Sequence, residues 1–66
     1  MKVNINGSLH ELETELPISE FIKSNGFDPR KIVIEHNGRI IGKSNWKTVI
    51  LRNSDHLVVL SFVGGG

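Results

Sequence analysis

The stretch that decides the fold is the run Leu57-Val58-Val59-Leu60-Ser61-Phe62-Val63, which leads directly into Gly64-Gly65-Gly66. A short, β-branched and almost wholly apolar run of this kind predicts a buried β-strand. Both of its alternating sets are apolar: Leu57, Val59 and Val63 form one, and Val58, Leu60 and Phe62 form the other. Only one set can face a covering helix, so the second must meet solvent, a flanking loop or a partner.

The glycines after this strand predict a slender, flexible arm that ends in a carboxylate. Glycine has no Cβ, so the arm can pass where any other residue is too wide. Three residues reach about 10 Å when extended. Such an arm suits insertion of the Gly66 carboxylate into the narrow active site of another protein, with Gly64 and Gly65 as its stem. The alternative is a frayed terminus without a role.

The rest of the chain predicts one small domain over residues 1–63, followed by the tail 64–66. The 66 residues include no cysteine, so no disulfide or thiolate zinc site is expected. No apolar stretch approaches the roughly 20 residues of a membrane span, and no signal peptide precedes the first strand. The net charge of +1 gives no drive toward nucleic acid or anionic lipid. We therefore expect a cytoplasmic monomer that binds neither nucleic acid nor membrane.

The charges are distributed unevenly along the chain. Residues 1–28 hold two lysines against five acidic residues, a net −3, whereas residues 29–66 hold six basic against two acidic residues, a net +4. Such a separation orients a partner if it persists in space. It cancels if the two halves interleave in the fold.

Turn and periodicity signals divide the chain into short elements. Asn6-Gly7 predicts a two-residue hairpin turn between a strand at 2–5 and a return strand at 8–13. Pro17, the stripe Ile18/Phe21/Ile22 and Asn25-Gly26 predict one helix over 18–25. Further strands are expected at 31–36, 39–42, 48–51 and 56–63, with Trp46 covering an edge of the core. The class is therefore α+β: a β-grasp (ubiquitin-like) fold, with a mixed sheet of four to five strands on one main helix and parallel first and last strands.

The chain lacks the residues of an active site of its own. His10, His36 and His56 show no metal-ligand spacing, and no Gly-x-Ser-x-Gly elbow or cysteine nucleophile is present. Glu11 and Glu13 are better explained as solvated hairpin residues than as an acid/base pair. What remains is the terminal carboxylate, which resists nucleophiles until its oxygen becomes a leaving group, as in an anhydride with AMP. We expect a protein acted on by enzymes, with no catalytic or metal site.

At this length, an apolar last strand joined to terminal glycines resembles the ThiS family, the sulfur carriers of thiamin biosynthesis. The resemblance covers the whole chain, including Val3-Asn4-Ile5-Asn6-Gly7, Ile32 to Gly38 followed by Ile40-Ile41, Trp46 and Asn53-Ser54-Asp55. One departure is Pro17, where the family more often has a capping Thr or Ser. This departure affects the start of the helix and leaves the chemistry untouched.

The resemblance implies a reaction cycle carried by Gly66. A ThiF-type adenylyltransferase activates its carboxylate, a sulfur donor such as a cysteine desulfurase converts it to a thiocarboxylate, and a ThiG-type thiazole synthase takes the sulfur. ATP and magnesium belong to the activating enzyme, so the chain itself binds no cofactor. Alternatives are the small subunit of molybdopterin synthase, another sulfur carrier, a ubiquitin-like modifier and a plain binding module.

The last strand also predicts a docking surface. Exposed apolar patches mark interaction sites, so the set turned away from the helix is expected to bind a partner. That set is either Val58/Leu60/Phe62 or Leu57/Val59. The alternative is that crossover residues such as Ile40, Ile41 or Trp46 cover it.

Overall fold

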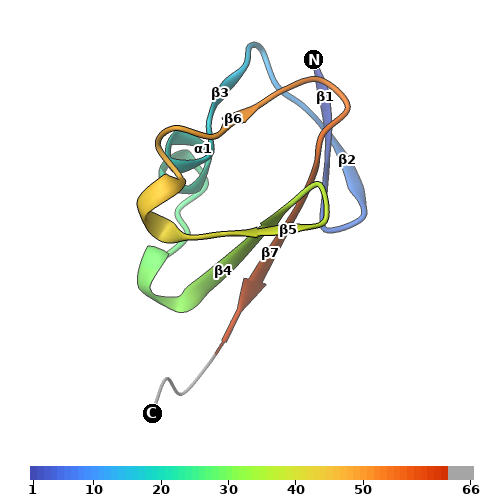
Figure 1. The fold of residues 1–66 in the computed structure, drawn as a ribbon. Coiled ribbons are helices and arrows are strands. Elements are labelled where there is room, and N and C mark those ends of the chain that lie inside the picture. Colours follow the sequence, from blue (N-terminus) through green and yellow to red (C-terminus); the bar gives the residue numbers. More distant parts are fainter. Residues whose placement is uncertain (63–66) are drawn as a thin grey trace.

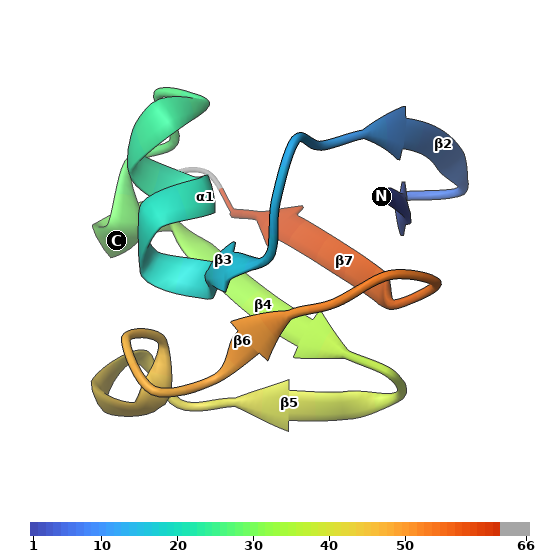
Figure 2. The ribbon, with the colours of Figure 1, turned by 90° about the horizontal axis from the view of Figure 1, so that it is seen from above.

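The computed structural model describes residues 1–62 and contains one mixed sheet of five strands in the order β2-β1-β7-β4-β5. A single helix, α1, lies against one face of this sheet (Figures 1 and 2). The elements are β1 Lys2–Ile5, β2 Ser8–Glu11, β3 Leu16–Pro17, α1 Ile18–Ser24, β4 Ile32–His36, β5 Arg39–Ile41, β6 Ile50–Leu51 and β7 His56–Ser61. Single 3₁₀ turns precede β4 at Pro29–Lys31 and follow β5 at Lys43–Asn45. The predicted β-grasp architecture is confirmed.

The last strand occupies the centre of the sheet. β7 runs parallel to β1, with Ile5 opposite Leu57, and antiparallel to β4, with Ile34 opposite Val59. The two hairpins turn at Asn6-Gly7 and Asn37-Gly38, and both residues of each turn have positive φ (51° and 86°, 49° and 84°). Positive φ at both central positions defines the hairpin turn that Asn-Gly favours. The first of these turns was predicted as such and is confirmed.

Helix α1 begins without a side-chain cap. Pro17 precedes it in an extended conformation (φ −61°, ψ 146°) and offers no capping oxygen. The free N–H groups of the first turn instead donate to the backbone: Ile18 to the carbonyl of Val49 and Ser19 to the carbonyl of Trp46, both at 2.9 Å. The helix ends at Ser24, followed by Gly26 with a φ of 73°. The backbone carbonyls of Trp46 and Val49, between β5 and β6, therefore replace the missing side-chain cap.

The core lies between α1 and the inner face of the sheet. It comprises Val3, Ile5, Ile18, Phe21, Ile22, Ile32, Ile34, Trp46, Leu51, Leu57 and Val59. The indole of Trp46 is only 5% exposed, and its Nε1 donates to the carbonyl of Ile41 at 3.1 Å. This hydrogen bond satisfies the indole N–H, the one polar group of the buried tryptophan side chain. Trp46 thus belongs to the core, as predicted.

Five predicted strands are shorter in the structure, two of them by a single residue: 31–36 begins at Ile32 and 39–42 ends at Ile41. The return strand expected over 8–13 ends at Glu11, and the strand expected over 48–51 is reduced to Ile50–Leu51. β6 pairs with β3 in a separate two-stranded sheet, which cannot lengthen because the helix begins immediately after Pro17. β7 ends at Ser61, so the predicted strand does not include Phe62, and its last predicted residue, Val63, lies outside the described residues. No helix within residues 1–62 is long and apolar enough to cross a bilayer.

Candidate functional site

The register of β7 separates its two apolar sets onto opposite faces of the sheet. Leu57 and Val59 are buried against the helix, at 0% and 6% exposure. Leu60 and Phe62 lie on the other face and remain 51% and 46% exposed, while Val58, two residues before Leu60 on the same face, is half-buried. The set turned outward is therefore Val58/Leu60/Phe62, and the alternative set Leu57/Val59 is wrong because it forms the core. Whether the outward set binds a partner stays a prediction.

Neighbouring strands extend this apolar surface. Val33 of β4 lies opposite Leu60, and Glu35 lies opposite both Val58 and Ile40 of β5. Ile40 is 61% exposed, and Trp46 is buried on the helix side, so neither residue covers the strand. We call Val33, Ile40, Val58, Leu60 and Phe62 the outer-face patch. Ile40, Leu60 and Phe62 are exposed and Val33 and Val58 are half-buried, which favours an interaction surface over a core position.

The fold does not gather the uneven charge of the sequence at opposite edges of the sheet, because β1 and β2 carry Lys2 and Glu11 while β4 and β5 carry Glu35 and Arg39. The acidic half of the chain supplies β1 and β2 at one edge of the sheet, and the basic half supplies β4 and β5 at the other. Exposed Glu11 lies on β2, and exposed Arg39 lies on β5. One pair, Arg52 with Glu15 at 3.3 Å, joins the two halves near the small sheet. The strands on both sides of the outer-face patch therefore carry balanced charges, and the separation along the sequence does not persist at the edges of the sheet.

The end of β7, from which the chain continues toward Gly64-Gly65-Gly66, is held from two sides. On the β1 side, the Asn6 side chain accepts from the N–H of Val59 at 2.7 Å and donates to its carbonyl at 3.2 Å. On the β4 side, the N–H of Phe62 donates to the carbonyl of Lys31 at 3.0 Å. The side-chain amide of Asn6 thus forms the hydrogen bonds that the backbone of a neighbouring strand would form, beyond the point where β1 ends. The direction in which β7 points is fixed up to Phe62.

A polar network holds the opposite end of β7. Asp55 accepts from His36 Nε2 and from the N–H of Arg52, both at 2.8 Å, and from Asn37 Nδ2 at 3.1 Å. Burial alone would raise the pKa of Asp55, but these hydrogen bonds outweigh it and hold the pKa below its ordinary value. The network joins two turns and contains no open position for a substrate. Within residues 1–62, no group of three or more His, Asp or Glu side chains is placed to bind a metal.

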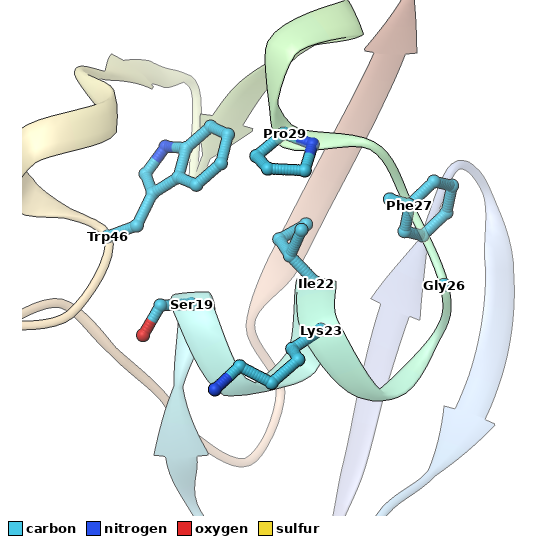
Figure 3. Close-up of a pocket in the computed structure, with 7 residues that line it drawn as sticks. All are labelled: Ser19, Ile22, Lys23, Gly26, Phe27, Pro29 and Trp46. Carbon is cyan, nitrogen blue, oxygen red and sulfur yellow. The ribbon is translucent and has the colours of Figure 1, made fainter.

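A cavity of about 320 Å³ lies on the helix side of the molecule, and sequence reasoning missed it. Its walls are mainly the apolar side chains of Ile22, Phe27, Pro29 and Trp46, with Ser19 and Lys23 along the helix (Figure 3). The lining offers a single titratable group, Lys23, so the cavity has no acid/base pair. In the sequence, Phe27 and Trp46 are apolar residues that lie outside the predicted apolar face of the helix. Their positions alone do not define a cavity.

The three predicted tail residues, Gly64, Gly65 and Gly66, lie outside the described residues. The structure therefore describes the chain up to Phe62 and the surface around that residue. That surface combines the outer-face patch with the held end of β7. Chemically, it offers apolar contact and free backbone, and it includes the half-buried carboxylate of Glu35, which lies opposite Val58 and Ile40.

Comparisons with known proteins agree on one family. The model of the ThiS family matches residues 3–66. A thiazole synthase of Magnetococcus marinus is 30% identical over the whole chain, and one of Paramagnetospirillum magneticum is 32% identical. The chain spans only 20% of the length of each of these relatives. A crystal structure of the thiamine biosynthesis protein ThiS from Geobacter metallireducens superposes with a TM-score of 0.87 at 20% identity, covering both chains completely. The chain therefore belongs to the ThiS family.

Proposed function

We propose that this chain is a sulfur carrier for the thiazole ring of thiamin. The observation that carries the proposal is the family match, which extends to residue 66 and so includes the terminal glycines. The glycines follow a strand whose end is held by hydrogen bonds to Asn6 and Lys31. The strand that leads to the Gly66 carboxylate therefore has a fixed direction. The reactive group is that carboxylate, and Gly64 and Gly65 form the stem.

The carboxylate requires two steps to become a sulfur donor. An activating enzyme of the ThiF type first joins it to the α-phosphate of ATP, and pyrophosphate leaves. Sulfide then attacks the acyl carbon, and AMP leaves to give the thiocarboxylate. Where the donor is a cysteine desulfurase, its persulfide attacks instead, AMP leaves, and a thiol reductant cleaves the resulting acyl disulfide to the thiocarboxylate. Glycine favours both steps because no side chain obstructs the approach to the carbonyl. ATP and magnesium are used in the site of the activating enzyme.

The acceptor of the sulfur is a thiazole synthase of the ThiG type. Support comes from the two thiazole synthases that contain a segment similar to the whole of this chain. A domain found in the same polypeptide as an enzyme is one that acts beside it. Transfer to a molybdopterin precursor or to target lysines uses the same activated carboxyl group, and the experiment below separates these outcomes.

The outer-face patch is the docking surface for the activating enzyme in this proposal. Leu60 and Phe62 are half exposed and lie immediately before the tail, so an enzyme that holds Gly66 has them within reach. Single charged residues lie on the two edge strands, Glu11 on β2 and Arg39 on β5. Complementary charges on the enzyme would fix the orientation in which the carrier binds.

The decisive experiment is intact mass spectrometry of the chain after incubation with ATP, magnesium, the activating enzyme and sulfide. A sulfur carrier gains the mass of one sulfur-for-oxygen exchange. Higher-mass conjugates would instead identify a protein modifier, and an unchanged mass would contradict any carrier role. Adding thiazole synthase or the large subunit of molybdopterin synthase, each with the substrate that accepts the sulfur, then identifies the partner, because only the true partner returns the chain to its original mass.

A further inference from the structure

The two edges of β7 are occupied unequally. On the β4 edge, pairing runs from Leu57 to Ser61 and continues with the bond from Phe62 N–H to the carbonyl of Lys31. On the β1 edge, strand pairing stops at Leu57 and is extended only as far as Val59 by the side chain of Asn6. β7 therefore has a neighbour on both sides in its first half and on one side at its end.

The direction of each backbone group follows from this pattern. Successive residues of a strand direct their N–H and C=O groups to opposite edges. Those of Val59 meet Asn6 on the β1 edge, and the N–H of Phe62 meets Lys31 on the β4 edge. The N–H and C=O of Ser61 consequently point to the β1 edge, where no strand of residues 1–62 continues, because the chain has turned away at Asn6-Gly7 (Figure 1). Ser61 itself is exposed.

The length of the tail brings an enzyme to this open edge. Four residues follow Phe62, and they span at most about 14 Å when extended. An enzyme that receives the Gly66 carboxyl group in its active site must therefore bring the mouth of that site close to Phe62. The unpaired groups of Ser61 lie one residue earlier, inside the surface that such an enzyme covers. Leaving them unpaired in a closed interface would cost binding free energy.

We propose that the thiazole synthase adds an extended segment to β7 beside Leu60–Phe62, in line with β1, and pairs with the backbone N–H and C=O of Ser61. This is strand addition at a sheet edge, in which the main chain supplies the contacts. The site ends before Val59, because the side chain of Asn6 already forms hydrogen bonds with the backbone N–H and C=O of Val59. The choice of partner rests on the proposed function and on the thiazole synthases that contain a segment similar to this chain.

The test is the affinity of full-length variants for the thiazole synthase of the same organism, measured by titration calorimetry. Ser61→Pro removes the N–H on the open edge and leaves the bonds to β4 in place, because proline is tolerated on the solvent edge of a strand. The matched control is Ser61→Ala, which changes the side chain and keeps the N–H. We expect Ser61→Pro to bind roughly five- to tenfold more weakly, as for one lost backbone hydrogen bond, and Ser61→Ala to bind like the wild type.

A second variant removes the donor without a ring. Stepwise chemical synthesis can place an ester in place of the Leu60–Ser61 amide, and this variant decides the question if Ser61→Pro fails to fold. Equal affinity of the ester variant and the wild type for thiazole synthase would overturn the inference. So would a loss of adenylation with unchanged affinity for thiazole synthase, since the edge would then belong to the activating enzyme. A wild-type chain that is never thiocarboxylated would overturn the proposed function instead, and the binding comparison would still be readable.

Discussion

The two ends of β7 are built differently. At its start, His56 exchanges two hydrogen bonds with Asn37, from its N–H to Oδ1 and from the N–H of Asn37 to its carbonyl, both at 2.8 Å. Asp55, directly before it, ties together two turns. At its end, Leu60 and Phe62 are half exposed and the backbone of Ser61 faces an open edge. Hydrogen bonds therefore fix the first end of β7, and exposed apolar side chains make the second end available for binding.

This division explains how a small domain can display apolar residues without loosening its core. Chains of this size bury only about 60% of their unfolded surface, so each core residue matters. Within residues 1–62, the last residue of the core is Val59, held by Asn6 and by the ladder to β4. The side chains of Leu60 and Phe62 beyond it are exposed and can contact a partner. Changes at the two ends should therefore have opposite effects on stability and on activity.

The largest expected effect comes from the tail. Deleting Gly66 should abolish productive thiocarboxylate formation, because the carboxyl group then lies about 3.3–3.6 Å short of the nucleotide. Gly65→Val should also fail, since a β-branched side chain does not fit a channel shaped for bare backbone. Both variants should melt like the wild type because a chain terminus contributes few stabilising contacts and, within residues 1–62, the last core residue is Val59. Mass spectrometry checks the first claim and thermal melting the second; a truncated chain thiocarboxylated at the wild-type rate would refute the role of the tail.

The next effect is on folding and comes from the core side of β7. Leu57→Ala should lower the free energy of unfolding by roughly 2–5 kcal/mol, because the side chain is fully buried and its removal leaves a cavity. For a domain of this size such a loss lowers the melting temperature by about 10 °C or more. Leu60→Ala, three residues later, is the matched control and should change stability by less than about 1 kcal/mol. Equal destabilisation by the two changes would contradict the division of β7.

The polar network should contribute less than the core and should depend on pH. Asp55→Asn replaces one accepting oxygen by a donor and should cost about 1.5–3 kcal/mol near neutral pH, the range for hydrogen bonds to a charged group. The pKa of Asp55 is lowered in the folded state from its ordinary value of 3.8. The unfolded chain therefore binds the proton more readily, and the carboxylate stabilises the fold fully above about pH 4. That contribution is lost as the pH falls through the lowered pKa.

Denaturant unfolding of wild type and Asp55→Asn from pH 7 to pH 2 measures this dependence. The difference between the two proteins should be largest near neutral pH and shrink below pH 4, by the sign just given. Asp28→Asn is the control, because Asp28 also has a lowered pKa but pairs with an exposed Arg30 at the surface. We expect it to have the smaller effect. A constant difference across the whole range would show that the charge of Asp55 is not what stabilises the turns.

Much of this fold was predictable because its signals are local. Asn-Gly at 6–7 and at 37–38 demands positive φ, and the structure has it at both turns. The stripe Ile18/Phe21/Ile22 produced a helix whose buried face is those three residues. Local patterns suffice where a residue's conformation depends on its neighbours in sequence.

The remaining features depend on partners that are distant in the sequence. Asn6 completes the pairing of Val59 across 53 positions, and His36 meets Asp55 across 19. No spacing rule in a single chain joins such residues. The pairing of β3 with β6 and the cavity beneath Trp46 likewise arise from how segments meet in space. For the docking surface, the sequence left two sets open, and only the register of β7 distinguished them.

The smallest predicted effect tests whether the open end of β7 binds the activating enzyme. Leu60→Ser should raise the KM for the carrier in adenylation about fivefold, because half of the leucine surface remains to be buried on docking, which is worth roughly 1 kcal/mol. The maximal rate should not change, since the side chain does not contact the reacting carboxyl group. ATP–pyrophosphate exchange at varied carrier concentration separates the two parameters.

Leu9→Ser is the matched control for this change. Leu9 is a leucine on β2, 68% exposed, opposite Asn4 at the far edge of the same sheet. Losing an exposed leucine there has the same chemical cost as at position 60, but position 9 lies away from the end of β7. We expect its KM to match that of the wild type. Equal increases from the two variants would mean that general surface apolarity, rather than the outer-face patch, governs recognition, and the end of β7 would then serve only to carry the tail.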